Sequence, residues 1–267
     1  MEKSWPKFLV IGTGFIFPRH EQAIKEIGGE IIEKVNDDNG PQYWKEALAN
    51  TKADYVSICT PNDLHFEMVK MANDLGKKVI CEKPLAIKVE HIKELAKRKN
   101  IFTVLQLRHH PLVKELKANL EPNKRHDVEM DIAVYRDKNY FEIWKGQTVR
   151  SGGVLYNLGV HYFDLMIYLF GMPEKFNTEF LNDKTGQGTM ENDKFFCKWR
   201  VSVDEQPDKQ RRVFRIDGRD YNFSSKDNLS YEDLHKYVYM DLMQGKGVTP
   251  KEQVATTELI AHLSQKI

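Results

Sequence analysis

The sequence predicts an α/β fold in two domains: a parallel sheet flanked by helices over residues 1–123, and an α+β domain with a mostly antiparallel sheet over residues 124–267. Up to about residue 107, short apolar runs alternate with helix-length stretches, which is typical of a parallel sheet with right-handed crossovers. Beyond about residue 123, strands instead alternate apolar and polar residues, as strands do when one face of a sheet is solvated.

The first domain is predicted to contain five strands, at residues 7–11, 30–35, 54–59, 78–81 and 102–107. Helices are expected between them, at residues 17–27, 43–50, 64–75 and 89–99. Gly28 and Gly29 should end the first helix, because glycine commonly ends helices. The polar residues 36–41 are expected to form a turn after the second strand.

The second domain is predicted to have strands at residues 128–135, 195–203 and 211–216, and the last leads into a hairpin turn at Asp217-Gly218. One long helix is expected at 154–170, and two more at 231–244 and 251–265. Residues 182–194 are polar and contain glycine, so this segment is predicted to be a mobile loop.

Composition excludes several classes of protein. A net charge of +1 gives no basic surface for nucleic acid, and no apolar run approaches the ~18 residues of a membrane span. The first residues lack the apolar core of a signal peptide. Cys59, Cys81 and Cys197 form no C-x-x-C pair, so we expect buried free thiols in a reducing cytoplasm, and no metal site.

Gly12 and Gly14 lie between the first strand and the first helix. The first glycine allows a tight turn, and the second lets a pyrophosphate approach the helix N-terminus, as in a Rossmann dinucleotide-binding domain. The third glycine of that pattern is replaced by Phe17. A tight turn without a ligand is the alternative.

An acidic residue about 20 positions further on should hold the adenosine ribose. Asp37 is the best candidate by chemistry, while Asn36 is an alternative by position. No arginine follows directly, which favours NAD over NADP; an ordinary polar turn is the other interpretation.

Thr60-Pro61-Asn62 follows the third strand as a rigid turn, and Asn62 or Asp63 is expected to cap the next helix. His65 then falls in the first turn of that helix, either as a cofactor contact or as a packing residue.

Lys83 stands between the fourth strand and Pro84. Proline favours extended geometry in the residue before it, so Lys83 should point beyond the carboxyl edge of the sheet, where ligands bind. A lysine in a desolvated pocket can exchange protons near neutral pH. The alternative is a surface lysine in an ordinary turn.

Asn157, His161 and Asp164 are spaced so that a helix places them on one face. Polar groups in an otherwise apolar helix need partners. Since the stripe begins after Gly152-Gly153, it favours a site over a buried core histidine.

These segments together resemble the Gfo/Idh/MocA family of nicotinamide-dependent sugar oxidoreductases. The matching pieces are Gly12-x-Gly14-x-Ile16, Cys59-Thr60-Pro61-Asn62-x-x-His65, Glu82-Lys83-Pro84 and Gly152-Gly153-(x)5-Gly159-x-His161-x-x-Asp164. The resemblance implies an NAD-dependent dehydrogenase acting on a sugar CH–OH group. The cofactor contacts that it implies are Gly12, Gly14, Phe15, Ile16, Asn36, Asp37, Thr60, Pro61, Asn62, His65, Glu82, Lys83 and Gln106.

Asn157 stands where many members of the family carry aspartate. With Leu105-Gln106-Leu107-Arg108-x-His110-Pro111 and Tyr140-Phe141-Glu142-x-Trp144-Lys145-Gly146, it is similar to a narrower group. That group oxidises UDP-N-acetylglucosaminuronic acid (UDP-GlcNAcA) at C3 for bacterial surface polysaccharide such as lipopolysaccharide O-antigen. The substrate contacts implied are Lys83, Arg108, Arg136, Lys145, Asn157 and His161, with Arg150 a further candidate; solvated surface charge is the alternative for Arg136, Lys145 and Arg150.

The resemblance also implies roles. His161 would take the hydroxyl proton, Lys83 would polarise the hydroxyl, and Asn157 would hold the sugar or the ribose without adding charge. Asp164 would either orient His161 or be a structural partner. A homodimer or homotetramer would form through the sheet of the second domain. The alternative functions are a dehydrogenase of a free sugar or cyclitol such as myo-inositol, and a non-catalytic dinucleotide-binding regulator, a class that can lack Lys83 and His161.

Overall fold

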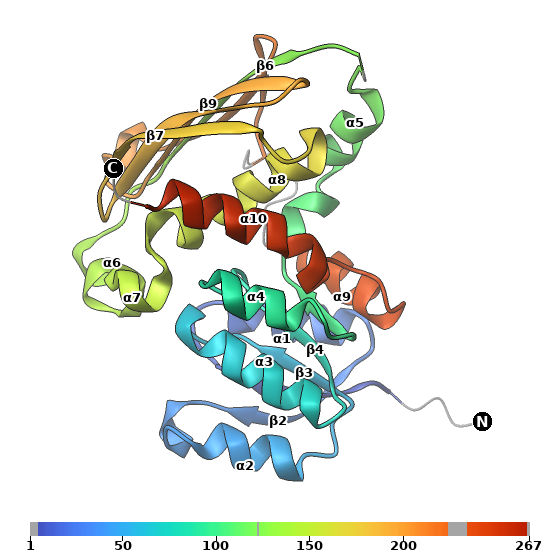
Figure 1. The fold of residues 1–267 in the computed structure, drawn as a ribbon. Helices are drawn as coiled ribbons and strands as arrows, with labels where there is room; N and C mark the ends of the chain where they lie inside the picture. The colour runs from blue at the N-terminus through green and yellow to red at the C-terminus, as the bar shows by residue number, and fades with distance from the viewer. Residues whose placement is uncertain (1–4, 122, 224–233, 266–267) are drawn as a thin grey trace. The chain divides into compact units, whose positions relative to one another are not determined.

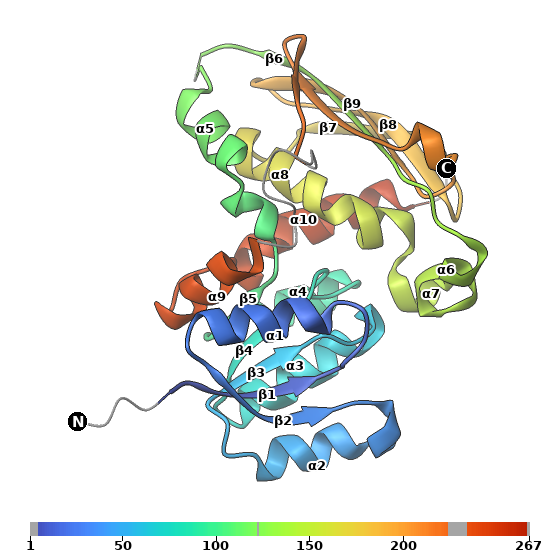
Figure 2. The ribbon, with the colours of Figure 1, turned by 180° about the vertical axis from the view of Figure 1, so that it is seen from behind.

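The computed structural model describes residues 5–121, 123–223 and 234–265 (Figures 1 and 2). The chain forms two compact units: Met1–Gln106 with Glu232–Val254, and Leu107–Tyr231 with Ala255–Ile267. These bounds differ from the predicted division into 1–123 and 124–267 in two ways: residues 107–123 belong to the second unit, and a late segment returns to the first unit. The periodicity of that segment predicts a helix but not the sheet against which the helix packs.

The first unit contains a five-stranded parallel sheet in the order β2-β1-β3-β4-β5, as expected for a Rossmann domain. Its strands are β1 (Lys7–Ile11), β2 (Glu30–Val35), β3 (Tyr55–Ile58), β4 (Lys78–Cys81) and β5 (Ile101–Thr103). Its helices are α1 (Phe17–Glu26), α2 (Tyr43–Asn50), α3 (His65–Asp74), α4 (Val89–Leu95) and α9 (His235–Met243). Residues 231–233 of the predicted α9 lie outside the described part of the chain.

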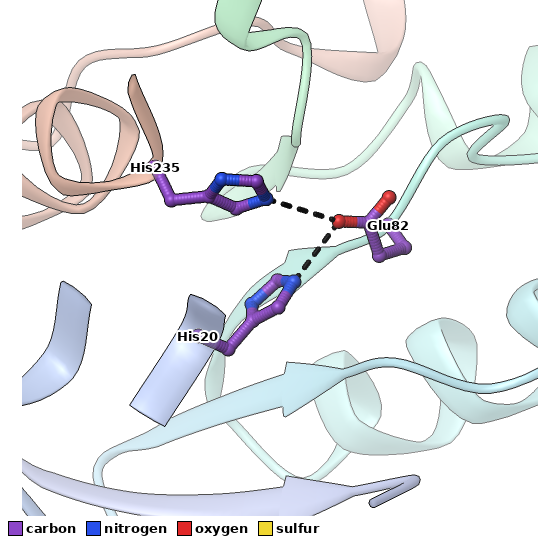
Figure 3. A group of neighbouring side chains, drawn as sticks. All are labelled: His20, Glu82 and His235. Carbon is purple, nitrogen blue, oxygen red and sulfur yellow. Dashed lines mark hydrogen bonds and ion pairs between the residues drawn. The ribbon is translucent and has the colours of Figure 1, made fainter. Parts of the chain in front are cut away.

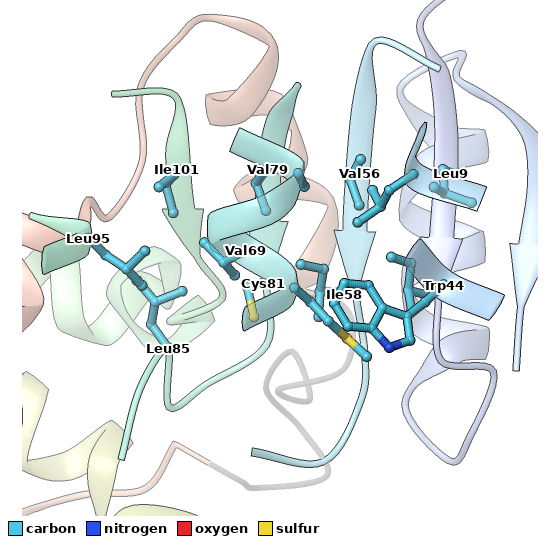
Figure 4. Close-up of a cluster of buried hydrophobic side chains, with 14 of the residues drawn as sticks. Leu9, Trp44, Val56, Ile58, Val69, Val79, Cys81, Leu85, Leu95 and Ile101 are labelled. Atoms are coloured by element: carbon cyan, nitrogen blue, oxygen red, sulfur yellow. The ribbon is translucent and has the colours of Figure 1, made fainter. Parts of the chain in front are cut away.

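Helices cover both faces of this sheet. On one face Trp44 from α2, Val69 from α3 and Leu95 from α4 pack against strand residues (Figure 4). On the other face α1 and α9 supply the apolar side chains, and Tyr239 is fully buried near Phe8 at a ring-centroid distance of 5.8 Å. The parallel strands are therefore buried on both sides, which explains their continuous apolar runs.

The second unit contains a six-stranded sheet in the order β11-β10-β6-β9-β8-β7. Only β6 and β9 pair in parallel; the other pairs are antiparallel, as predicted. The strands are β6 (His126–Ala133), β7 (Lys175–Leu181), β8 (Thr185–Glu191), β9 (Phe195–Ser202), β10 (Arg211–Ile216) and β11 (Arg219–Tyr221). The helices include α5 (Pro111–Asn119), α6 (Lys138–Glu142), α7 (Thr148–Ser151) and α8 (Val160–Phe170), while α10 (Pro250–Leu263) contributes residues to both units.

The predicted mobile loop at residues 182–194 is wrong, because residues 185–191 form strand β8 between β7 and β9. The glycines of this segment weaken its strand pattern in the sequence, but they also allow the strand to pack closely. A Cβ at Gly186 would lie 2.9 Å from a methyl of Leu155, and one at Gly188 would lie 1.9 Å from the carbonyl oxygen of Asn177. Glycine is needed here for close packing, although it weakens the strand signal in the sequence.

The hairpin between β10 and β11 turns at Asp217 and Gly218, as predicted, and both residues have positive φ. Burial raises the pKa of Asp217, but hydrogen bonds from Lys124, from the Asp127 amide and from His126 outweigh it and lower that pKa from 3.8 to about 2. These charge-assisted hydrogen bonds therefore stabilise the turn.

All three cysteines are free and buried, as predicted. Within the described ranges, no helix is long and apolar enough to span a bilayer.

Candidate active site

The turn after β1 has the two properties that the glycines predict. Gly12 has φ +94°, and a Cβ there would lie 2.6 Å from the Cys59 carbonyl oxygen, so only glycine fits between the two neighbouring strands. Gly14 has no atom within 4 Å of an added Cβ, so space is open beside its backbone. Ile16 precedes α1 and provides no side-chain cap, and Phe15 is 84% exposed. This arrangement suits an anionic group at the start of α1.

The structure separates the two ribose candidates. The Asn36 side chain accepts a hydrogen bond from the Asp38 backbone amide, and the Asn36 backbone amide donates to Oδ1 of Asn39 in a reciprocal cap. Asp37 instead has an exposed side chain at the start of this short 3₁₀ turn. Asp37 is thus the better placed of the two to meet a ribose.

The expected capping role of Asn62 or Asp63 is wrong. Both lie inside a 3₁₀ turn that runs directly into α3, and Pro61 and Leu64 precede these helical segments without a side-chain cap. His65 is fully buried, and its ring nitrogens lie 2.7 Å from the Pro84 carbonyl oxygen and 2.9 Å from that of Thr60. Burial lowers the pKa of His65, so its neutral ring donates to one of these carbonyls at a time. This geometry favours the packing role over direct cofactor contact.

Lys83 follows β4 and is half-buried. Its amide donates to Oε2 of Glu82 at 3.1 Å, while Nδ1 of His65 lies 2.7 Å from the Pro84 carbonyl oxygen on the other side. Glu82 is 8% exposed, and its other oxygen, Oε1, meets His20 and His235 (Figure 3). The turn that presents Lys83 is therefore fixed by buried polar groups on both sides.

The first unit fits a dinucleotide. Gly14 leaves room at the start of α1, and Asp37 offers a carboxylate for ribose hydroxyls. Gln106 is 8% exposed, and no described residue hydrogen-bonds its Oε1 atom. A buried carbonyl oxygen without a protein donor suits a ligand that brings an N–H or O–H group.

In the second unit, the predicted long helix begins with one π-helical turn, Leu155–Gly159, before α8. Asn157 lies in the π turn and His161 in the first turn of α8, and both are half-buried. A single π turn inside a helix is frequent at functional sites.

Asn157 belongs to a cluster of basic and aromatic side chains. Its Nδ2 atom donates to the Tyr140 hydroxyl at 2.5 Å. The Arg136 guanidinium lies 5.4 Å and the Lys145 ammonium 5.7 Å from the centre of the Tyr140 ring. Burial raises the pKa of Tyr140, so its hydroxyl keeps its proton near neutral pH. The cluster of Arg136, Tyr140, Lys145 and Asn157, called here the basic-aromatic cluster, can hold an anion beside a neutral amide.

Arg108 and Asp164 form a buried ion pair. Arg108 donates from Nε at 2.8 Å and from Nη2 at 2.7 Å to the two oxygens of Asp164, which is 1% exposed. Thr256 adds a contact at 3.4 Å to the same carboxylate. This geometry favours a structural role for both residues over substrate contact by Arg108 or orientation of His161 by Asp164.

Two contacts of the site could not be predicted from the spacing of residues in the sequence. Tyr140 stood inside a recognised motif, but its partner Asn157 is 17 positions away. Glu82 was expected at the cofactor, whereas its contacts to His20 and His235 come from segments 62 and 153 positions away. Arg150, the further candidate for substrate contact, lies half-buried in α7.

A glycine turn that opens onto a helix start, followed by a lysine at the carboxyl edge of the same sheet, defines a dinucleotide-dependent oxidoreductase scaffold. Two family models support this class: "Oxidoreductase family, NAD-binding Rossmann fold" matches residues 32–101, and "Oxidoreductase family, C-terminal alpha/beta domain" matches residues 126–200. Together they cover more than half of the chain. The protein belongs to the Gfo/Idh/MocA oxidoreductase family, which confirms the predicted family, the enzyme class and NAD as cofactor.

Solved structures agree over nearly the whole chain. The WlbA (WbpB) dehydrogenase of Thermus thermophilus, in complex with NAD and UDP-GlcNAcA, has a TM-score of 0.86 and 29% identity, over 98% of this chain and 95% of that one. WlbA of Bordetella pertussis, with NADH and UDP-GlcNAcA, has a TM-score of 0.83 over 98% and 95% of the two chains. At 19% identity, this second likeness shows the fold alone.

Sequence relatives match over shorter stretches. Levoglucosan dehydrogenase of Pseudarthrobacter phenanthrenivorans is 29% identical over 161 residues, which is 56% of this chain and 41% of that protein. Across such relatives the matched part spans from 37% to 53% of their length.

Proposed function

We propose that the protein oxidises UDP-N-acetylglucosaminuronate at C3, with NAD as hydride acceptor. The observation that carries this proposal is the likeness to the T. thermophilus WlbA dehydrogenase, which extends over nearly the full length of both chains. The basic-aromatic cluster supports it, because a uronate carboxylate or a diphosphate needs cationic side chains and a free cyclitol does not.

Bound NAD supplies the site that accepts the hydride from the sugar carbon. His161 takes the proton of the C3 hydroxyl as general base, since histidine ordinarily titrates near neutral pH. Lys83 donates a hydrogen bond to the same oxygen and stabilises the negative charge that develops there. Carbon C3 thus loses its hydrogen as a hydride and its hydroxyl loses a proton to His161, so that a ketone remains.

Asn157 donates to the sugar or the ribose without adding charge. Because its amide is already bound to the Tyr140 hydroxyl, its orientation is fixed before substrate arrives. Arg136 and Lys145 hold the carboxylate or the diphosphate, and Arg150 is a weaker candidate for the same task.

A dehydrogenase of a free sugar or cyclitol is the second candidate, favoured by relatives such as levoglucosan dehydrogenase and inositol 2-dehydrogenase. Isothermal titration with UDP separates the two, since only the nucleotide-sugar enzyme should bind it. An absence of UDP binding together with turnover of myo-inositol would reject the proposal.

Substitution tests the mechanism itself. Lys83→Ala and His161→Ala are each expected to lower kcat by at least about 10²-fold with NAD binding retained. Turnover at the wild-type rate in both variants would instead support a non-catalytic role for the pair.

We further propose a cytoplasmic enzyme of bacterial surface polysaccharide assembly. Its assembly as a homodimer or homotetramer through the second-unit sheet is also proposed. The outer face of that sheet carries ion pairs such as Asp131 with Arg211, which suits a polar interface. Light scattering after size exclusion should give twice or four times the chain mass of 31.2 kDa, whereas a monomer would contradict the assembly.

A further inference from the structure

The buried carboxylate of Glu82 connects Lys83 to a polar network inside the first unit. Its Oε1 atom lies 2.9 Å from Nε2 of His20 and 3.6 Å from Nε2 of His235 (Figure 3). Its Oε2 atom accepts the Lys83 amide at 3.1 Å. One carboxylate thus joins two helices, α1 and α9, to the backbone of the residue proposed to polarise the substrate hydroxyl.

The hydrogen bonds that Glu82 accepts have a fixed direction. A carboxylate only accepts, so Nε2 of His20 carries the proton that it donates to Oε1. In the neutral ring Nδ1 then accepts from the Tyr239 hydroxyl at 2.7 Å or from the Ser57 hydroxyl at 3.3 Å, and these two hydroxyls lie 2.7 Å apart. The network therefore runs from Ser57 through Tyr239, His20 and Glu82 to the Lys83 amide.

Protonation agrees with this direction. Burial lowers the pKa of His20, and the hydrogen bond with Glu82 offsets only part of that effect, so the ring is neutral. Burial alone would raise the pKa of Glu82, but the hydrogen bond from His20 and the proximity of the His235 ring outweigh it and hold that pKa well below its usual range. An ionised acceptor and a neutral donor give a single consistent hydrogen-bond pattern.

Simple packing does not require such a network. Burying a carboxylate costs free energy that an apolar side chain of similar size would avoid. The two flanking rings are themselves buried, at 0% and 2% exposure for His20 and His235. An apolar side chain in place of Glu82 would leave the Lys83 amide without this hydrogen bond. The next residue, Pro84, has no N–H to donate in its place.

We propose that His20 is a positioning residue for Lys83: it holds Glu82, backed by Tyr239 and His235, so that the second carboxylate oxygen fixes the Lys83 backbone. The inference rests on the proposed function only in its kinetic consequence; its structural consequence, protection of the Lys83 amide, does not depend on the substrate.

The same three residues have the composition of a metal site, because ligand atoms of His20, Glu82 and His235 lie within 4.8 Å of one another. The hydrogen bonds favour the positioning network instead. Both ring nitrogens of His20 and the second oxygen of Glu82 already have protein partners at hydrogen-bond distance.

Hydrogen exchange of the Lys83 amide in the full-length protein tests the structural consequence. His20→Phe removes the donor to Glu82 and is expected to accelerate this exchange at least about tenfold. His20→Gln supplies an amide donor in place of Nε2–H and should restore most of the protection. Tyr55→Phe is the matched control, because Tyr55 is buried in the same apolar cluster but lies outside the network, and it should leave exchange unchanged.

Kinetics with UDP-GlcNAcA test the second consequence. His20→Phe is expected to lower kcat on the order of 10²-fold, with KM and the NAD dissociation constant unchanged, and His20→Gln should recover most of the rate. If the wild type does not turn over this substrate, the proposed function fails, while the exchange experiment still decides the inference.

Three results would overturn the positioning role. One is a Lys83 amide in His20→Phe that exchanges at the wild-type rate. Another is a Lys83 amide that exchanges as fast in His20→Gln as in His20→Phe. The third is about one equivalent of zinc in the purified wild type that is lost in His20→Gln, which would establish a metal site. If His20→Phe does not fold, Glu82→Gln replaces it, since it keeps the volume but lacks the charge, and it should show the same loss of exchange protection.

Discussion

Replacing Asp164 with alanine is expected to destabilise the second unit by about 3–5 kcal/mol, because the change leaves the Arg108 guanidinium buried without its counter-charge. The Arg108 side chain is 13% exposed and the Asp164 side chain 2%, so water can replace little of the lost interaction. Two charge-assisted hydrogen bonds, of about 1.5–3 kcal/mol each, are lost together and give a total of the same size.

A second Asp–Arg pair in the same unit provides the matched control. Asp131 and Arg211 meet on the outer face of the sheet with side chains 21% and 36% exposed. Asp131→Ala should therefore cost about 1 kcal/mol or less. The double variant Arg108→Met with Asp164→Leu should lose much less than Asp164→Ala, because no unpaired charge remains buried.

Urea unfolding measures both costs. Trp144 and Trp199 report on the second unit, so the transition that shifts should be visible in their fluorescence, and the midpoints give the free-energy differences. A loss for Asp164→Ala no larger than that for Asp131→Ala would refute the buried-pair argument. A stable Asp164→Asn variant with strongly reduced kcat would show instead that Asp164 orients His161.

Gly12→Ala is expected to cost the first unit about 1–2 kcal/mol or more, because a φ of +94° is strained for alanine and the new methyl would lie 2.6 Å from a carbonyl oxygen. Gly14→Ala should instead keep the wild-type melting temperature and weaken NAD binding; equal melting temperatures in the two variants would contradict this contrast. Tyr140→Phe removes the hydroxyl that orients the Asn157 side-chain amide and should lower kcat/KM about tenfold in initial-rate assays. An unchanged kcat/KM would show that Tyr140 does not orient Asn157 for catalysis. The folded-state pKa of Asp217, about 2, lies below its ordinary value of 3.8, so its contribution is complete above pH 3.8 and is lost as the pH falls towards 2. Acid unfolding followed by circular dichroism should thus be shallower over this range in Asp217→Asn, and parallel curves would disprove the assignment.

Local signals in the sequence predicted the first unit well. Strand β1 and helix α2 lie where the apolar runs and turn residues place them, because both depend on neighbouring residues alone. The Gly12 turn and the position of Lys83 after β4 were predictable for the same reason.

Features that depend on distant partners were not predictable. Strand β8 reads as a loop because its glycines fit closely against residues of other segments, such as Leu155. The role of Asp164 stayed open until its pairing with Arg108, 56 positions earlier, was known. The π turn that contains Asn157 also left no signature in the sequence.

The return of residues 232–254 to the first unit has a consequence for synthesis on the ribosome. Tyr239 and Val248 contribute to the first unit, yet they are translated long after Gln106. At about 5–20 residues per second, roughly seven to thirty seconds separate the synthesis of Gln106 from that of the late segment. During that interval the apolar side of α1 in the nascent dinucleotide domain is not yet covered by α9. Chaperone binding to the nascent chain should therefore be strongest in this interval and should end when α9 emerges.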